Sequence, residues 1–435
     1  MGGLFLLGAR FKYGGLSVDY ADVRLLRPLG IVATLTLLAS GHASANILEV
    51  GVNAGAKLNG MGGAGSAHVS GATAAVVNPA GLAETGQLDA NVSFVGMYGT
   101  SQAPANGPDT DVRSTSFVPL PMITAAYRLT DRVAAGLFFY TPSGAGGTFD
   151  GVNYGIPGLP PRPFGLTMYD FEAGPALACR LPWRINLGVA YRVSWVRGSL
   201  NAYDPSSLAS GSPLYAQTSM SGTDFTGFKI GAQANPIGRL KLGLVYRTPI
   251  TVNLSGKTTV MDGATGATVG EMDISARVRN VDKLLAGATY QWIEGVLLTS
   301  LDYERQFYSR SRDIMLTSAV SSTDIPQHYR DSNIIRLGGE FRVRPGLPLR
   351  LGLGVFDNFR ESAYVNATSG GAPAPTFLIS AGAGLALTRT LDVDFSYTLM
   401  LNSGTLGSAG LAPTGTPGNY SSNTQAFALN LGYHR

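Results

Sequence analysis

Apolar and polar residues alternate along most of the chain after residue 87, as they do in strands with one dry face and one wet face. In the segment 335–343 every second residue is apolar, and arginines, a glycine and a glutamate stand between them. Segments 187–195, 349–356 and 391–398 alternate in the same way. The pattern predicts fourteen strands, over residues 87–100, 115–128, 132–141, 167–180, 184–202, 218–235, 239–255, 268–291, 295–309, 331–344, 347–361, 375–388, 391–402 and 424–434.

The connections between these strands alternate in length. Seven are long, roughly 12 to 26 residues, and rich in Gly, Ser, Pro and Asn. Six are tight turns, at 129–131, 181–183, 236–238, 292–294, 345–346 and 389–390. A β-sandwich has no reason to collect short turns at one end, whereas an outer-membrane barrel with an even number of strands does so. Segment 268–291 could be two strands that meet near Val281, but one long strand keeps the even count and is our prediction.

Composition excludes other classes. Of the 435 residues 14% are charged and 45% hydrophobic, so the charges are too few to cover a water-facing surface of this size. A helical membrane protein needs several apolar runs of about 20 residues, and only one segment approaches that length. The net charge is +4 and no run of five basic residues occurs, so we predict no nucleic-acid binding. Cys179 is the single cysteine, so neither an intramolecular disulfide nor a cysteine-based metal site is expected, and no cofactor is predicted.

The N-terminus has the order of a secretory signal peptide. Arg24 and Arg27 precede an apolar core at 29–39, and Ala43-Ser44-Ala45 follows as a cleavage site. A membrane anchor is the alternative, but the core is short and no stop-transfer charges follow it. We therefore assign 1–45 to the signal peptide and interpret 1–23 as an extension from a misassigned start codon, with translation truly beginning near Val18 or Val23.

Residues 46–86 do not alternate and are dominated by Gly, Ala, Asn and Val. The run Gly60 to Gly65 is not a phosphate-binding loop, because it lacks the Lys-Ser/Thr pair and a preceding strand. Small residues let a chain pack tightly inside another structure. We predict that 46–86 is a hatch that plugs the lumen of an all-β transmembrane barrel formed by 87–435.

Several short motifs resemble a known family. They are Leu58-Asn59-Gly60-Met61-Gly62-Gly63-Ala64, Asn78-Pro79-Ala80-Gly81-Leu82 just before the first predicted strand, and the strand sequences at 242–250 and 336–340. Together with the fourteen predicted strands, these motifs resemble the FadL/TodX family of outer-membrane transporters. This chain departs from the family pattern at Gly71, where many members have Asp, and at its end, where Tyr433 is followed by His434 and Arg435.

The resemblance implies a fold, a location and a function. A fourteen-stranded barrel in the outer membrane of a Gram-negative bacterium would contain an N-terminal hatch. It would take up long-chain fatty acids or aromatic hydrocarbons passively, and the cargo would leave sideways into the outer leaflet through a gap made by an inward kink of the third strand. Its expected partners are hydrophobic small molecules, outer-membrane lipid and lipopolysaccharide, and the barrel assembly machinery, and we expect a monomer.

Apolar residues at inward positions are candidates for substrate contact. An alternative for each is contact with the hatch. Those on strands are Val95, Met97, Leu120, Met122, Phe138, Tyr140 and Phe356. The predicted long loop 141–165 adds Phe149, Tyr154 and Phe164, which would either capture substrate first or pack on neighbouring loops.

Inward arginines could anchor a substrate carboxylate. The candidates are Arg192, Arg336 and Arg350, with Arg342 beside them. The alternative is that they pair with inward acids such as Asp302 and Glu340, as charges inside barrels commonly do. The sequence leaves open whether the substrate is a fatty acid or a neutral hydrocarbon.

An enzyme is not predicted. The chain has four histidines, and none shares a plausible depth in the barrel with a serine and an acid that could complete a catalytic set. The remaining alternative to a transporter is a general porin or a structural barrel.

Overall fold

A computed structural model describes residues 54–435 except 108–109, 205–206, 209–210, 319–321, 367–371 and 413–414. The predicted signal peptide and its cleavage site lie outside the described residues. Among the helices in the described part, none is long and apolar enough to cross a membrane.

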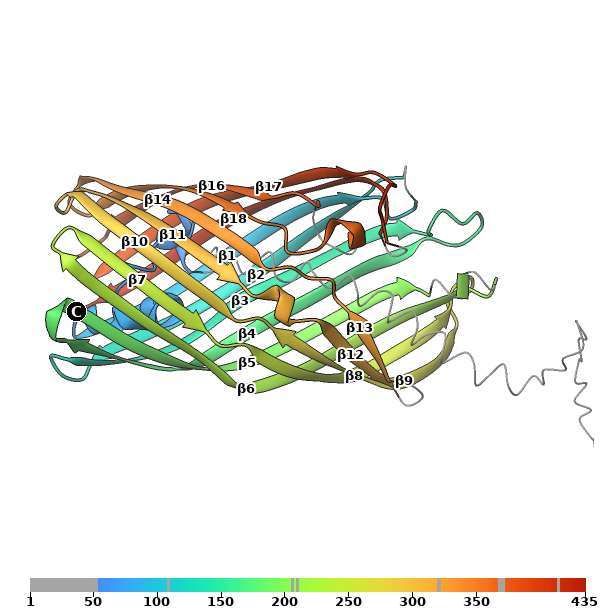
Figure 1. The fold of residues 1–435 in the computed structure, drawn as a ribbon, viewed down its shortest axis with the longest axis horizontal. Coiled ribbons are helices and arrows are strands. Elements are labelled where there is room, and N and C mark those ends of the chain that lie inside the picture. The colour runs from blue at the N-terminus through green and yellow to red at the C-terminus, as the bar shows by residue number, and fades with distance from the viewer. Residues whose placement is uncertain are drawn as a thin grey trace, which may run out of the picture.

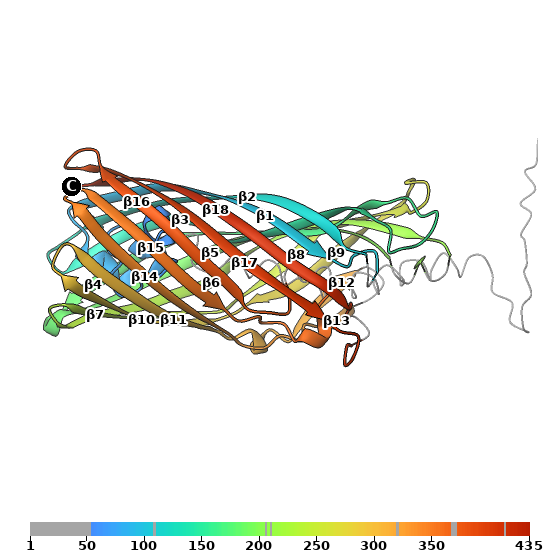
Figure 2. The same cartoon turned by 90° about the horizontal axis from the view of Figure 1, so that it is seen from above.

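Eighteen strand segments form one antiparallel sheet, which closes on itself because β1 pairs with both β2 and β18 (Figures 1 and 2). Closure leaves no sheet edge, so backbone groups within the ladders are paired, as hydrocarbon requires. The segments are β1 (Leu88–Ala103), β2 (Val112–Arg128), β3 (Val133–Val152), β4 (Arg162–Leu181), β5 (Ile185–Tyr203), β6 (Leu214–Ile237), β7 (Leu240–Arg247), β8 (Ile250–Asp262), β9 (Thr268–Asn280), β10 (Lys283–Ile293), β11 (Leu297–Gln306), β12 (Asp313–Ser318), β13 (Ser322–Pro326), β14 (Ser332–Arg344), β15 (Leu347–Phe356), β16 (Thr376–Ala386), β17 (Leu391–Leu406) and β18 (Gly418–His434).

The eighteen segments make fourteen crossings of the barrel wall, because four crossings are each divided into two segments. The divided crossings are β7 with β8, β9 with β10, β11 with β12, and β13 with β14. The pairing shows this directly, since β6 pairs with both β7 and β8, while β9 pairs with β8 and β12 and β10 pairs with β7 and β11. The predicted fourteen-stranded barrel is confirmed. Segment 268–291 is one crossing, interrupted at Val281 and Asp282.

Turn lengths separate the two ends of the barrel. The short turns lie at the end that holds the C-terminus (Figure 1), and one of them contains the 3-10 helix η2 (Pro182–Arg184). The other end carries the longer connections, which include η4 (Ser362–Tyr364) between β15 and β16, whereas η3 (Tyr308–Arg310) interrupts the β11–β12 crossing of the wall. The predicted separation of short and long connections is present only in part: the β15–β16 connection has 19 residues, but the β3–β4 connection has 9 and the β8–β9 connection has 5, below the expected 12 to 26.

The predicted ends of several strands are wrong at the long-loop end. The third strand was expected to stop at residue 141, but β3 continues to Val152 and β4 begins at Arg162. Most of the predicted loop 141–165 is therefore strand. Beyond the hydrocarbon both faces of a strand meet polar surroundings or other loops, so the apolar alternation that marks a strand disappears there.

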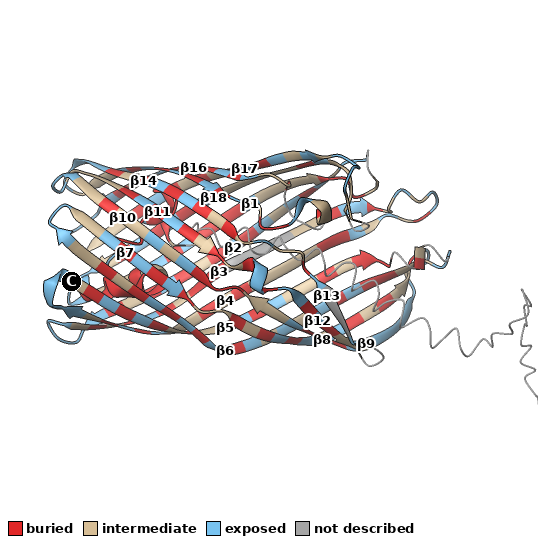
Figure 3. Cartoon of the chain, in the orientation of Figure 1, coloured by how far each residue is buried: buried red, intermediate tan, exposed pale blue. Residues whose placement is uncertain are grey.

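Burial alternates along the strands (Figure 3). In β15 the leucines at 349, 351 and 353 are exposed, Leu351 by 68%, and Arg350, Gly352 and Gly354 between them are buried. The apolar face thus points outward to lipid, and the polar face points into the lumen.

An N-terminal segment of residues 54–86, here called the inner segment, lies inside the barrel near the short-turn end (Figure 1, blue). It contains the helices α3 (Ala56–Asn59) and α4 (Ala74–Val77) and the 3-10 helix η1 (Pro79–Glu84). Wall glycines let its backbone touch the barrel: a Cβ on Gly188 would lie 2.3 Å from the carbonyl carbon of Pro79, and one on Gly352 would lie 2.1 Å from the nitrogen of Gly62.

Candidate functional site

Asn78 attaches the inner segment to β6. Its side-chain oxygen caps η1 by accepting the Ala80 N–H at 3.2 Å, and Pro79 fills the first turn, where no donor is needed. The side-chain nitrogen donates to the carbonyls of Ser66 and Ala232 at 2.8 and 3.1 Å. The Asn78-Pro79-Ala80 motif therefore orders the inner segment, and its side chains serve structure at the barrel wall.

Asp302 on β11 holds the other side of the inner segment. Its carboxylate accepts the N–H groups of Gly65 and Ser66 and the Ser66 hydroxyl, each at 3.0 Å. Sequence reasoning considered Asp302 only as an ion-pair partner for an arginine. Its inward position was readable from the alternation, but its backbone partners more than 230 residues away were not.

Replacing Asp302 with Ala is expected to loosen the inner segment. The change removes three hydrogen bonds to a carboxylate and leaves two buried N–H groups without a partner, at a cost of about 3 kcal/mol or more. We expect faster proteolysis within residues 54–86 in the folded barrel and a raised leak of small sugars in a liposome-swelling assay. Asp313→Ala, at an exposed position of β12, is the matched control, and equal behaviour of the two variants would contradict the anchoring role.

Glu172 on β4 is the centre of a buried polar cluster. It pairs with Arg192 at 2.8 Å and with Arg247 at 2.5 Å, and it accepts the hydroxyls of Ser194 at 3.2 Å and Tyr140 at 3.0 Å. The sequence analysis missed Glu172 and Arg247. Their inward positions on β4 and β7 were the available signal.

The other two predicted carboxylate anchors are also held by acids. Arg336 pairs with Glu304, and Arg350 pairs with Glu340 at 2.8 Å and Asp394 at 2.5 Å. Arg342 is half exposed and reaches Glu340 at 3.1 Å. The structure thus has the ion pairs that were the alternative to a substrate anchor, although the partner of Arg336 is Glu304 and not Asp302.

A cavity of about 110 Å³, here called the lower cavity, lies between the inner segment and the wall. Four cationic side chains and one carboxylate line it together with apolar groups. Lys229, only 5% exposed, donates to the Val76 carbonyl and lies 5.5 Å from the centre of the Tyr140 ring. The lining includes the charged side chains of Lys229, Arg247, Lys283, Arg336 and Glu304 and the apolar or aromatic side chains of Val76, Val77, Tyr140, Pro142, Val245 and Leu285.

The predicted apolar substrate contacts fall into three separate groups. Met122, Phe138 and Tyr140 pack with Leu82 and other side chains of the inner segment. Val95, Met97, Leu120 and Phe356 belong to a lumen-facing cluster with Val118, Ile334, Leu378, Met400 and Ala56, here called the central cluster. Phe149 and Phe164 belong to a third group toward the long-loop end, against which Tyr154 packs.

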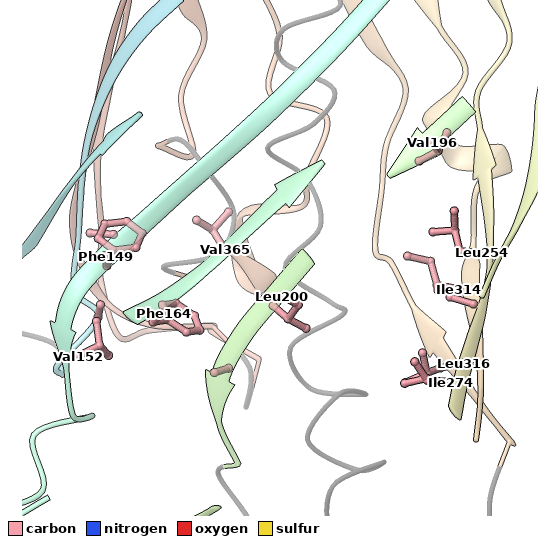
Figure 4. Close-up of a cluster of buried hydrophobic side chains, with 14 of the residues drawn as sticks. Phe149, Val152, Phe164, Val196, Leu200, Leu254, Ile274, Ile314, Leu316 and Val365 are labelled. Carbon is pink, nitrogen blue, oxygen red and sulfur yellow. The ribbon is translucent and has the colours of Figure 1, made fainter. Parts of the chain in front are cut away.

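This third group, the upper cluster, fills the barrel interior toward the long loops (Figure 4). It includes Phe149 and Phe164 from β3 and β4, Leu200 from β5, Ile314 and Leu316 from β12, and Val365 from the β15–β16 loop. Beside it a cavity of about 60 Å³ is lined mostly by apolar side chains, among them Met168, Met220 and Leu254. Phe149 and Phe164 were assigned to a loop from the sequence, but they lie on strands.

The ladder between β2 and β3 is broken. The two strands pair at Thr115 with Thr148 and at Met122 with Tyr140. Between these pairs, in the described backbone, residues 116–121 of β2 do not pair with residues 141–147 of β3. We call this the β2–β3 break. Over the same stretch β3 remains paired with β4, for example Gly144 with Tyr169. Pro119 and Pro121 lie on β2 at the break, and a proline within a sheet is confined to an unpaired edge or a bulge.

A bulge in β3 accompanies the break. Between the pairs Tyr140 with Glu172 and Ser143 with Asp170, β3 has two residues where β4 has one. Thr141 and Pro142 are both buried, which departs from the alternation, and Pro142 lines the lower cavity. A bulge bends its strand, and this one lies at the start of the stretch in which β3 has no partner on β2. Pro142 was not singled out from the sequence, although a proline within a strand was an available signal for a bulge.

Comparisons with known proteins agree with this geometry. The family model described as outer membrane protein transport protein (OMPP1/FadL/TodX) matches residues 36–434. A Pseudomonas aeruginosa FadL homologue has a similar structure, with a TM-score of 0.73, 19% identity, and coverage of 87% of this chain and 98% of that one. The P. putida toluene transporter TodX gives a TM-score of 0.69, 15% identity, and coverage of 88% and 98%.

A third solved structure, the Ralstonia pickettii toluene transporter TbuX, gives a TM-score of 0.68 at 17% identity and covers 87% of this chain and 98% of that one. No curated protein matches the sequence. The likeness in structure establishes the fold, and the family model extends over most of the chain. The chain therefore belongs to the FadL/TodX family of transport proteins in the outer membrane of Gram-negative bacteria.

Proposed function

We propose that this protein carries hydrophobic compounds passively across the outer membrane and releases them sideways, through the β2–β3 break, into the outer leaflet. The observation that carries the proposal is that Pro142 lies in the bulge beside the break and also lines the lower cavity. A molecule in that cavity is therefore next to the one stretch where β2 and β3 share no hydrogen bonds in the described wall.

The proposed route begins at the long loops. Lipopolysaccharide hinders hydrophobic molecules from entering the membrane directly, and the apolar upper cluster offers them a first binding surface. The lower cavity lies deeper, against the inner segment. We propose that residues 46–86 form the hatch that obstructs the axial path, so that the wall is the exit. Signal-peptide cleavage near Ala45, monomeric function and insertion by the barrel assembly machinery complete the proposal.

For the substrate, we favour a long apolar molecule with a carboxylate over a neutral hydrocarbon. The lower cavity combines apolar walls with cationic side chains: Lys229 donates to the Val76 carbonyl, while Arg247 pairs with Glu172 and Arg336 with Glu304. Cations buried in an apolar cavity attract an anionic headgroup more strongly than they do in water. A neutral aromatic hydrocarbon is the second candidate, since relatives of similar fold are described as toluene transporters.

Replacing Lys229 with Met is expected to separate the two substrates. The change keeps most of the side-chain volume and removes the charge, so the affinity for a fatty acid should fall by roughly tenfold, the equivalent of 1.4 kcal/mol, while the affinity for an alkylbenzene stays the same. Displacement of a fluorescent ligand by palmitate and by ethylbenzene measures both. Lys257→Met, at an exposed position of β8, is the control. An equal effect on both ligands would contradict the carboxylate preference.

A further inference from the structure

Tyr169 of β4 belongs to the outer face of the barrel by its position in the sheet. It pairs across the ladder with Arg197 of β5, which is exposed, and residues paired in this way share a face. Its chain neighbours point the other way: Met168 packs on the upper cluster, and Asp170 is buried in the lumen. Alternation along β4 thus directs Tyr169 toward lipid.

The Tyr169 ring nevertheless packs against the central cluster, which faces the lumen. That cluster includes Val118 and Leu120, both within the stretch of β2 that lies in the break. A side chain on the outer face cannot reach a lumen-facing cluster through an intact ladder, because the backbones of neighbouring strands lie only about 4.8 Å apart. Tyr169 is paired with Gly144, in the part of β3 that has separated from β2. The ring therefore reaches the lumen side at the break.

Two further rings continue from Tyr169 along the outer face. Tyr169 stacks on Phe171 with ring centres 6.1 Å apart and planes inclined by 15°, and Phe171 stacks on Phe139 at 6.2 Å and 9°. All three side chains are half-buried, unlike Phe377 on the outer face of β16, which is 59% exposed. We call these three residues the aromatic row. It leads from the break onto the lipid face of β3 and β4.

We propose that Tyr169 is the gate of the lateral exit and that the aromatic row is the surface along which the cargo passes into the outer leaflet. The proposal rests on the lateral route given above. Gly144, opposite Tyr169 on β3, has no side chain to obstruct a rotation of the ring. Flat apolar rings bind alkyl chains and aromatic molecules without demanding one shape, so the row would favour passage over tight binding.

Side-chain size at position 169 tests the gate. With Tyr169→Ala the exit should widen, and uptake of a radiolabelled alkylbenzene or fatty acid by cells should rise about threefold; with Tyr169→Trp it should fall by roughly tenfold. Tyr169→Phe keeps the ring and should behave like the parent protein. Ligand affinity, measured by displacement on the purified barrel, should be the same in all three variants, because the gate lies outside the cavity that binds.

Tyr397 provides the matched control. It is a half-buried tyrosine of the outer face on β17, tilted against Phe427 at 5.0 Å, and β18 and β1 separate its strand from β2. Tyr397→Ala and Tyr397→Trp should leave uptake unchanged. The gate proposal would be overturned if uptake did not depend on the size of residue 169. It would also be overturned if uptake depended on the size of residue 397 in the same way as on residue 169. If the Tyr169→Trp variant fails to assemble, the comparison of uptake between Tyr169→Ala and Tyr169→Phe tests the gate.

The failure of the gate and the failure of the lateral route give different results. If residue 169 has no effect while removal of the β3 bulge stops uptake, the gate is wrong and the lateral route stands. If removal of the bulge also leaves uptake unchanged, the lateral route itself is wrong.

Discussion

Deleting Pro142, together with Pro119→Val and Pro121→Val, is expected to lower the uptake of a hydrophobic compound at least tenfold. The deletion leaves one residue of β3 opposite Phe171 of β4, as in a regular ladder. Residue 141 would then point outward, next to the inward residue 140, and the two valines would supply the N–H groups that proline lacks. β3 could pair with β2 along its whole length, which would close the exit.

The affinity of the purified barrel for its ligand separates closure from damage. We expect it to change little, because the side chains of the upper cluster and most of the lower cavity stay in place. Deleting Gly407 in the loop after β17, where no atom lies within 4 Å of an added Cβ, is the control for the loss of one residue. Normal uptake by a folded variant without the bulge would contradict lateral release.

Deleting residues 46–86 is expected to convert the closed barrel into a sugar-permeable pore. The inner segment lies in the lumen near the short turns, where wall glycines approach its backbone closely. Without it, liposomes that contain the barrel should swell in small sugars at least ten times faster than liposomes with the full protein, since only a barrel with a water-filled channel behaves as a porin. The parent protein should give almost no swelling.

A point variant tests the same claim in the full chain. Gly352→Val places a side chain where a Cβ alone would lie 2.1 Å from the nitrogen of Gly62, so the inner segment must move. Gly270→Val, where nothing lies within 4 Å, is the control. Swelling unchanged by both the deletion and Gly352→Val would contradict the plug. Rapid swelling with the parent protein would favour a general porin.

The barrel could be predicted from the sequence because its physical cause is local. Hydrocarbon on one side of the wall imposes an apolar residue at every second position, and this signal survives without any knowledge of long-range contacts. The same reasoning explains the errors. Around Phe149 and Phe164 glycines, prolines and polar residues interrupt the alternation, so these residues were assigned to a loop.

The contacts of the site depend on registers between distant strands, which no local pattern carries. Inward arginines were recognised, but Glu172, which binds Arg192 and Arg247, was not, because its importance comes from the meeting of β4, β5 and β7. Tyr169 is a sharper case. Alternation along β4 gives it an ordinary lipid-facing position. Only the break between β2 and β3 gives its ring access to the lumen side.

The most direct test follows the cargo to its destination. A fluorescent fatty acid is added outside vesicles that carry the protein and have lipopolysaccharide in the outer leaflet. In one experiment a quencher is attached to outer-leaflet lipid, and in a second experiment a quencher is dissolved in the internal water. We predict that the lipid-attached quencher acts first and that this early quenching disappears when the β3 bulge is removed. Earlier quenching by the internal aqueous quencher would contradict lateral release and would mean that cargo passes along the barrel axis.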